Sequence, residues 1–194
     1  MSLTRQQYTL IGLFALFFAP LILVMLMRSP FWDYRPAGLK NKGQLVQPPL
    51  ALPISEELQG EWLLTYVTPA ECGDNCLNSI AALRQIYKAS GRQQEHLKIL
   101  VLNAEGTNPG LAQKIESIYT GIVYMPATPP ATLDQLDKLK TELQAKSDSQ
   151  SVSQTYILDP MQNVILAYTA DTSPSDINKD LKNLLKWSKA DEVQ

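Results

Sequence analysis

The sequence has few of the residues that hold metals or build disulfide scaffolds. Its 194 residues include two cysteines and one histidine. Two cysteines are too few for a disulfide scaffold, and without a second Cys/His cluster there is no zinc-binding pattern. Sulfur or soft-metal chemistry must therefore centre on Cys72 and Cys76, and His96 is the only imidazole that could join them.

An excess of positive charge is also missing, because the formal net charge is −2. A chain without a basic field lacks the electrostatic attraction that brings proteins to phosphate backbones, so we expect no nucleic-acid partner. The length leaves room for an N-terminal segment and one globular domain.

The longest uncharged apolar run lies near the N-terminus. Residues 10–27 form 18 consecutive residues without a charge, between Arg5 and Arg28. This length is just sufficient to span a bilayer. We predict a short tail at residues 1–9 and a transmembrane anchor at residues 10–28.

A cleavable signal peptide is the competing interpretation of this run. Its apolar region would be shorter, and no small-x-small cleavage pattern follows Met27. Phe31, Trp32 and Tyr34 instead resemble an aromatic anchor at a membrane surface. We therefore expect the helix to be retained as a single-pass anchor.

The charges beside this anchor do not settle its orientation. Arg5 precedes it, whereas several basic residues follow: Arg28, Arg35, Lys40 and Lys42. The positive-inside rule thus favours a cytoplasmic C-terminal domain. A cysteine pair is, however, better suited to an oxidising compartment, so the two arguments disagree.

The remaining sequence divides into a linker and a domain. Residues 29–56 are rich in proline, glycine and lysine without a helical or alternating period, which indicates a juxtamembrane linker. The domain is predicted at residues 57–190.

Within the domain, strands and helices alternate in the first half and a hairpin follows. The predicted elements are strand 62–67, helix 77–90, strand 98–103, helices 109–121 and 133–145, a loop at 146–154, hairpin strands 156–158 and 164–168, and helix 174–187. A helical crossover makes the first two strands parallel. This order, β-α-β-α-β-β-α, predicts an α/β protein with a thioredoxin-like fold behind the transmembrane helix.

Cys72 and Cys76 lie where the first strand passes into the first helix. The first turn of a helix has unpaired N–H groups and a positive dipole end, which favour thiolates. The pair is thus a candidate for disulfide exchange or for binding Cu(I), which prefers thiolate ligands. Glu71 and Asp74 flank the cysteines and oppose thiolate formation by like-charge repulsion. A structural disulfide closing one small loop is the alternative.

A third metal ligand is hard to find. His96 follows the first helix, so about fourteen helical residues place it roughly 20 Å from Cys76, and replacing it should leave metal binding intact. Met125 and Met161 are better explained as ordinary packing residues.

The residues that lead into the third strand, 151–154, should face the cysteine pair. Thioredoxins have a cis-proline at this place, which guides substrate disulfides. The nearest proline here, Pro160, follows the strand. This departure disfavours a general-purpose disulfide reductase.

These features together resemble the Sco (SenC/PrrC-like) family. The resemblance rests on the N-terminal anchor, the proline-rich stalk, the C-x-x-x-C pair at a strand–helix junction, and the residues Tyr-Ile-Leu-Asp-Pro at 156–160. The chain looks most like the small Sco-related membrane proteins of proteobacterial oxidase clusters, over about residues 41–190. The stretches that carry this closer likeness are 41–46, 60–64 and 180–187.

The resemblance implies a membrane-tethered factor that assists assembly of the Cu(A) centre of cytochrome c oxidase. Its two copper-binding cysteines correspond to Cys72 and Cys76. The family histidine corresponds to Ser151 or a neighbour, and the usual proline of the cysteine loop is absent. It also implies a bacterial inner-membrane location with a periplasmic C-terminal domain. The implied partners are the copper-bearing oxidase subunit or other assembly factors.

Three functions remain open from the sequence. The first is an oxidase assembly factor that uses Cys72 and Cys76 to reduce thiols or to hold Cu(I), copper being the one cofactor expected. The second is a general periplasmic thiol–disulfide oxidoreductase. The third is a non-catalytic interaction domain with a structural disulfide. We expect an assembly factor rather than a turnover enzyme.

Overall fold

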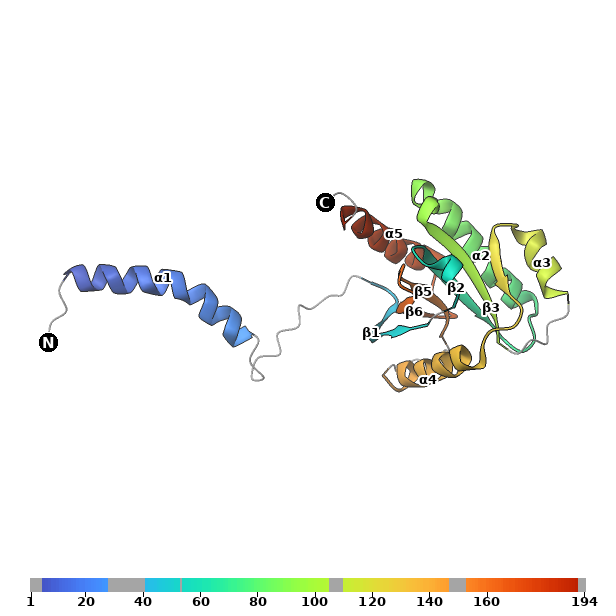
Figure 1. The fold of residues 1–194 in the computed structure, drawn as a ribbon, viewed down its shortest axis with the longest axis horizontal. Coiled ribbons are helices and arrows are strands. Elements are labelled where there is room, and N and C mark those ends of the chain that lie inside the picture. Colours follow the sequence, from blue (N-terminus) through green and yellow to red (C-terminus); the bar gives the residue numbers. More distant parts are fainter. Residues whose placement is uncertain (1–4, 28–40, 53, 105–109, 147–152, 192–194) are drawn as a thin grey trace. The chain divides into compact units, whose positions relative to one another are not determined.

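The computed structural model describes residues 5–27, 41–52, 54–104, 110–146 and 153–191 (Figure 1). The chain forms two compact units, Met1–Leu39 and Lys40–Gln194. We describe each unit by itself.

The described part of the first unit is the helix α1 (Arg5–Met27), with Pro20 inside it. Its segment Arg5–Leu23 has a mean hydropathy of 1.6, and none of it is buried. Apolar side chains such as Leu16 and Phe17 are largely exposed, at 80% and 73%. By length and composition the helix is able to cross a membrane, and it lies where the sequence predicts an anchor.

The second unit is built on a six-stranded mixed sheet with the order β1-β6-β5-β2-β3-β4. β2, β3 and β4 are parallel, whereas β5, β6 and β1 are joined by antiparallel pairings. The strands are β1 (Gln44–Ala51), β2 (Trp62–Thr68), β3 (Leu97–Asn103), β4 (Ile122–Met125), β5 (Ser153–Leu158) and β6 (Asn163–Thr169).

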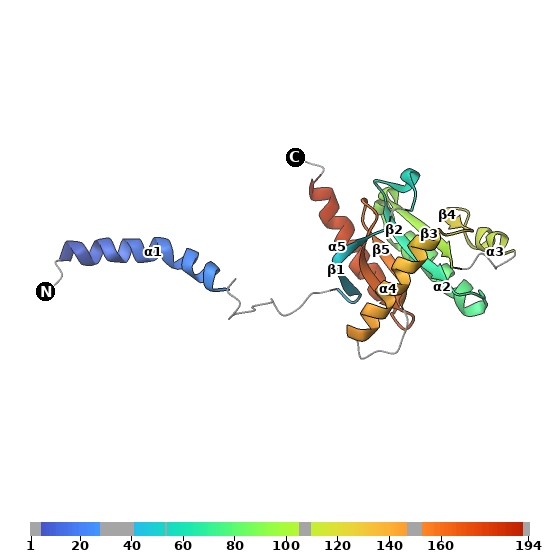
Figure 2. The same cartoon turned by 60° about the horizontal axis from the view of Figure 1, so that its bottom comes forward.

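Helices cover both faces of this sheet (Figures 1 and 2). Four α-helices, α2 (Asp74–Ala89), α3 (Leu111–Ile118), α4 (Pro130–Lys146) and α5 (Pro174–Asp191), accompany two 3₁₀ helices, η1 (Glu56–Leu58) and η2 (Gly91–His96). Core residues of α2, α3 and α5 pack with Leu64 and Tyr66 on one face, whereas those of α4 pack with Leu63 and Val67 on the other. Every residue of β2 is buried, which explains its continuous apolar run.

The predicted element order is present, with two strands in addition. The first is β1, which lies inside the segment 29–56 for which the sequence analysis predicts a linker. β1 pairs with β6, so the folded part of the chain starts before the predicted boundary at residue 57. Two adjacent prolines, Pro48 and Pro49, interrupt the alternation that would have indicated a strand. We call residues 41–52 the N-terminal strap.

A buried carboxylate holds the start of the N-terminal strap. Asp180 of α5 is 2% exposed and accepts hydrogen bonds from the backbone N–H groups of Lys42 (2.7 Å) and Gly43 (2.9 Å). The Tyr168 hydroxyl donates to the same oxygen at 3.2 Å. Burial and the neighbouring Asp180 raise the pKa of Tyr168. A Cβ atom at Gly43 would lie 2.6 Å from the Tyr168 ring, so the close approach requires glycine.

A buried glutamine holds the other end of the strap and residues 54 and 55 beyond it. Gln162, in the turn between β5 and β6, accepts a hydrogen bond from Ile54 N–H through its side-chain oxygen at 2.6 Å. Its side-chain NH₂ donates to the Ser55 carbonyl, and its own carbonyl accepts from Leu52 N–H at 2.9 Å. Gln162 has a φ of 63°, an uncommon conformation for a residue with a side chain.

The second additional strand is β4, which extends the sheet beyond β3. The sequence analysis places no strand between the helix 109–121 and the prolines that follow. Four residues are too few to show a period, and the strand is formed by its parallel pairing with β3. Two helices begin one turn earlier than predicted, α2 at Asp74 instead of residue 77 and α4 at Pro130 instead of residue 133, whereas α5 begins at Pro174 as predicted.

Candidate functional site

The two cysteines form a disulfide at the carboxyl end of β2. Cys72 lies in the loop after the strand, and Cys76 is the third residue of α2. Their Cα atoms are 5.2 Å apart, a separation within the usual range for a disulfide. Because the helix starts at Asp74, the bond joins the loop to the first helical turn rather than to a later one.

The two sulfurs differ in their access to solvent. Cys76 is 4% exposed and belongs to the core on the α2 face, whereas Cys72 is half-buried and packs against that core. An incoming thiolate must reach the sulfur that it attacks. Cys72 is therefore the sulfur that is more accessible to an attacking thiolate, and Cys76 would be the leaving sulfur of such an attack.

The first turn of α2 favours negative charge on the released sulfur. The residue that caps the helix, Gly73, has no side chain to bind the first N–H groups. The first backbone bond of the helix runs from Leu77 N–H to the Gly73 carbonyl at 3.1 Å. Cys76 lies in this first turn, where the positive end of the helix dipole stabilises a thiolate.

Two exposed carboxylates act in the opposite direction. Glu71 and Asp74 are exposed, and both line a shallow pocket of 440 Å³ together with Cys76. Like-charge repulsion from these groups disfavours a thiolate nearby. The site therefore combines a helix terminus that stabilises the thiolate with carboxylates that destabilise it.

A buried polar pair joins the carboxyl ends of the parallel strands beside the disulfide. The Thr68 hydroxyl donates to the side-chain oxygen of Asn103 at 3.1 Å, and the Asn103 amide donates to the Pro126 carbonyl at 3.1 Å. Thr68 ends β2, Asn103 ends β3, and Pro126 follows β4. The sequence analysis missed Asn103, although a polar residue that closes a buried apolar run would have been a signal for it.

The start of β5 lies beside β2 near the same end of the sheet. Thr155 pairs with Tyr66, and the Tyr66 hydroxyl donates to the side-chain oxygen of Gln154 at 3.3 Å. Burial raises the pKa of Tyr66, and a hydrogen bond with Ser79 lowers it. The predicted approach of residues 151–154 toward the cysteine end is thus observed for Gln154, while Ser151 lies outside the described residues.

No cis-proline starts β5 in the part of this strand that the structure describes. The cis peptide bond of the described chain joins Gln47 to Pro48 in β1. Pro160 lies in the turn after β5, as the sequence predicts. This turn follows Leu158, which pairs with Leu63 at the amino end of β2, so it lies at the end of the sheet away from the disulfide.

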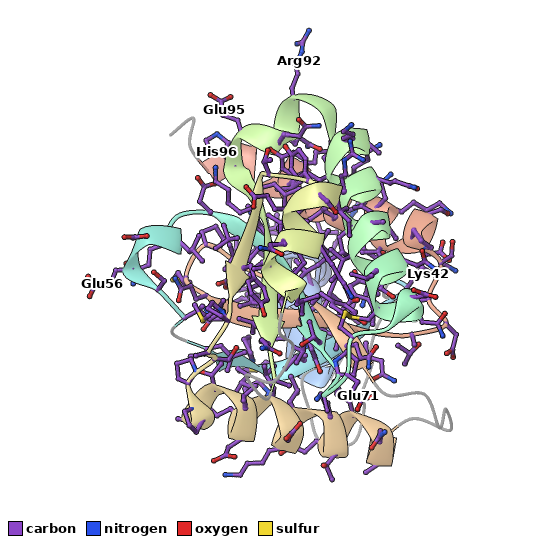
Figure 3. The ribbon with its side chains drawn as sticks, turned by 90° about the vertical axis from the view of Figure 1, so that its right-hand side faces the viewer. Lys42, Glu56, Glu71, Arg92, Glu95 and His96 are labelled. Carbon is purple, nitrogen blue, oxygen red and sulfur yellow. A yellow bond between two sulfur atoms is a disulfide. The ribbon has the colours of Figure 1, made fainter. Side chains whose placement is uncertain are left out.

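The other predicted ligand candidates are not brought to the cysteines. His96 precedes β3, whose seven residues run parallel to β2, so a strand length of about 20 Å separates it from the disulfide end. Figure 3 shows His96 and Glu71 at opposite ends of the unit. Met161 is 78% exposed in the β5–β6 turn, and Met125 packs against the core on the α4 face.

A metal site with three ligands is absent from the described residues. No group of three or more His, Cys, Asp or Glu side chains there could hold an ion. Copper coordinated by two cysteines and a histidine would find only the two sulfurs, and only after the disulfide is reduced. These residues do not fit such a centre, and we derive no step through copper.

Comparison with solved structures supports the fold. The solution structure of apo Sco1 from Thermus thermophilus superposes with a TM-score of 0.53 at 14% identity, covering 76% of this chain and 99% of that one. The crystal structure of Arabidopsis thaliana ScoI with copper bound gives 0.51 at 11% identity, covering 68% and 88%. At these identities the likeness shows the thioredoxin-like fold alone. No curated protein matches the chain in sequence.

A family model also matches most of the second unit. Its description reads "Transmembrane-like, thioredoxin-like, C-terminal domain", and it covers residues 62–188. The match starts at the first residue of β2 and extends into α5, so it includes the disulfide and both core faces. The chain therefore belongs to this family of transmembrane-like proteins with a thioredoxin-like C-terminal domain.

Proposed function

We propose that this protein is a membrane-anchored thiol–disulfide exchange factor that acts through Cys72 and Cys76. The observation that carries the proposal is the disulfide between a half-buried Cys72 and a buried Cys76 in the first turn of α2. A bond that only closed a five-residue loop would add little to stability, because short loops lose little entropy on closure.

The exchange is a two-electron reaction in two steps. A Cys72 thiolate attacks one sulfur of a client disulfide and displaces the other as a thiolate, which takes up a proton. Cys76 then attacks the Cys72 sulfur, releases the client as a dithiol and leaves the Cys72–Cys76 disulfide. A dithiol donor protein must return two electrons and two protons to the pair before the next cycle.

We further propose that the client belongs to the assembly of a respiratory copper oxidase. The support is the Sco-like sequence pattern, the Sco structures that share the fold, and the apolar helix α1. In this proposal α1 anchors the protein in a bacterial inner membrane, residues before the strap form the tether, and the second unit faces the periplasm. The client is then the copper-bearing subunit, whose cysteines must be reduced before they bind metal.

The reduction potential of the pair tests this function. The full-length protein in detergent is equilibrated with glutathione buffers, and the fraction of free thiols is measured by alkylation, with Cys72→Ser as the control. A potential above about −300 mV supports exchange, whereas a lower one marks a structural disulfide and overturns the proposal.

Copper holding is the competing use of the same pair, and Cu(I) titration of the reduced protein distinguishes it. Exchange predicts weak binding that a competing chelator removes, because the described residues add no third soft ligand to the two sulfurs. Tight binding that is lost in both Cys72→Ser and Cys76→Ser would replace exchange with copper holding as the function.

A further inference from the structure

The two edges of the sheet differ in how they are protected. At one edge, β1 contains Pro48 and Pro49 and its register with β6 shifts between Leu45 and Leu50. Prolines lack the N–H that a further strand would need, and an irregular register misaligns the remaining groups. This edge cannot readily accept another strand.

The opposite edge of the sheet is β4 (Figure 2). It contains no proline, and its pairing with β3 has no register shift. Its sequence is Ile-Val-Tyr-Met, without a proline or a charged residue, and among the described strands it pairs with β3 alone. Natural edge strands usually contain charges, prolines or bulges that prevent pairing with other chains. The surrounding residues 117–133 also contain no charged side chain.

β4 is less buried than the strand beside it. Ile122 and Tyr124 pack against the core on the α2 face, and Val123 packs against the core on the α4 face. Although both faces are covered, these residues are only half-buried, whereas β3 in the next position is almost fully buried. This lower burial agrees with the position of β4 at the edge of the sheet.

We infer that β4 pairs with β4 of a second copy of this chain, forming a two-fold antiparallel dimer with a continuous sheet. A two-fold axis at the edge places the same residues against each other, so an uncharged strand meets no like-charge repulsion. Four residues make a small contact, so the dimer is weak in solution. Anchoring by α1, taken from the proposed function, confines the copies to one membrane and raises their local concentration.

Symmetry restricts the register of this pairing. Residues directly opposite in an antiparallel pair point to the same face, so one residue of β4 must oppose itself. The condition is met when the two-fold axis passes between the two copies of Val123 or between the two copies of Tyr124. Opposed Cα atoms lie about 4.5–5.5 Å apart, which is within reach of a disulfide.

Cysteine cross-linking of the full chain in liposomes tests the inference. The background is Cys72→Ser/Cys76→Ser, which has no other thiol. Val123→Cys and Tyr124→Cys are oxidised and compared with Gln47→Cys, an exposed position on the protected edge. We expect one of the β4 variants to form at least tenfold more covalent dimer than Gln47→Cys. Equal yields at both edges, or cross-links from β4 only to other proteins, would overturn the inference.

A charge variant gives a second measurement that needs no cross-link. Val123→Lys should lower energy transfer between donor- and acceptor-labelled copies in the same liposomes at least tenfold, whereas Gln47→Lys should not change it. Unchanged energy transfer in Val123→Lys also contradicts the inference. These readouts do not depend on thiol exchange, so a failure of the proposed redox function and a failure of the dimer are distinguishable.

Discussion

The carboxylates beside the disulfide are exposed, whereas the polar side chains that hold the N-terminal strap are buried. At the disulfide end, Glu71 and Asp74 are exposed and flank a half-buried sulfur. At the strap, the Asp180 carboxylate and the Gln162 amide are buried and each bonds backbone groups of a distant segment. An exposed group remains free to react and to interact with a partner, whereas a buried group with all its partners holds two segments in place.

The largest effect should come from removing the sulfurs. Cys72→Ser and Cys76→Ser should each lower the rate of exchange with a disulfide-bonded peptide by roughly a thousandfold or more, because the two sulfurs act as a unit. Cys76→Ser should in addition accumulate a mixed disulfide at the accessible Cys72. His96→Ala is the matched control at the far end of the sheet, and a substantial loss of exchange in it would contradict the placement of the site.

The next largest effect should come from the strap. Asp180→Ala leaves the N–H groups of Lys42 and Gly43 and the Tyr168 hydroxyl without their acceptor, which should lower the free energy of unfolding by about 3 kcal/mol. Urea unfolding measures this change. Asp176→Ala, on the same helix, loses an ion pair with the exposed Lys179 and a favourable charge in the first helical turn, and should cost about 1 kcal/mol. Equal losses in the two variants would mean that the strap is not held by Asp180.

Alkaline pH should weaken the contact between Tyr168 and Asp180. Burial and Asp180 raise the pKa of Tyr168 above its value of 10 in the unfolded chain. The folded state therefore keeps a proton that the unfolded state loses, so this contribution is complete below pH 10 and declines as the pH rises further. We expect the unfolding free energy to fall by up to about 1.4 kcal/mol per pH unit for this group above pH 10. The slope should be shallower in Tyr168→Phe, and an identical slope would contradict the assignment.

The smallest effect should come from the carboxylates at the disulfide end. With the pair reduced, Glu71→Gln and Asp74→Asn should each raise the rate of alkylation of Cys72 at pH 7 by about two- to threefold, because an exposed charge is strongly screened. Glu95→Gln, an exposed carboxylate at the His96 end (Figure 3), is the control and should leave the rate unchanged. A lower rate in Glu71→Gln would mean that this side chain assists the thiolate rather than opposing it.

The disulfide end was more accessible to sequence reasoning than the strap. The apolar run of β2, the helical spacing of Ile80 and Leu83, and the two cysteines between them are local signals, and together they placed the candidate site. The strap has no such signal, because its strand forms by pairing with β6, which is more than a hundred residues away in sequence. Asp180 and Gln162 were therefore missed as anchoring residues.

The sequence by itself determined the thioredoxin-like order of elements, the apolar N-terminal helix and the position of the cysteine pair. Hydrophobic period, chain length and residue chemistry depend on neighbours along the chain, so they can be read directly. Only the tertiary structure decided that Cys76 is buried while Cys72 is half-buried, and that β1 and β4 form the two edges of the sheet. Burial and strand pairing are set by contacts between distant segments, which no local pattern records.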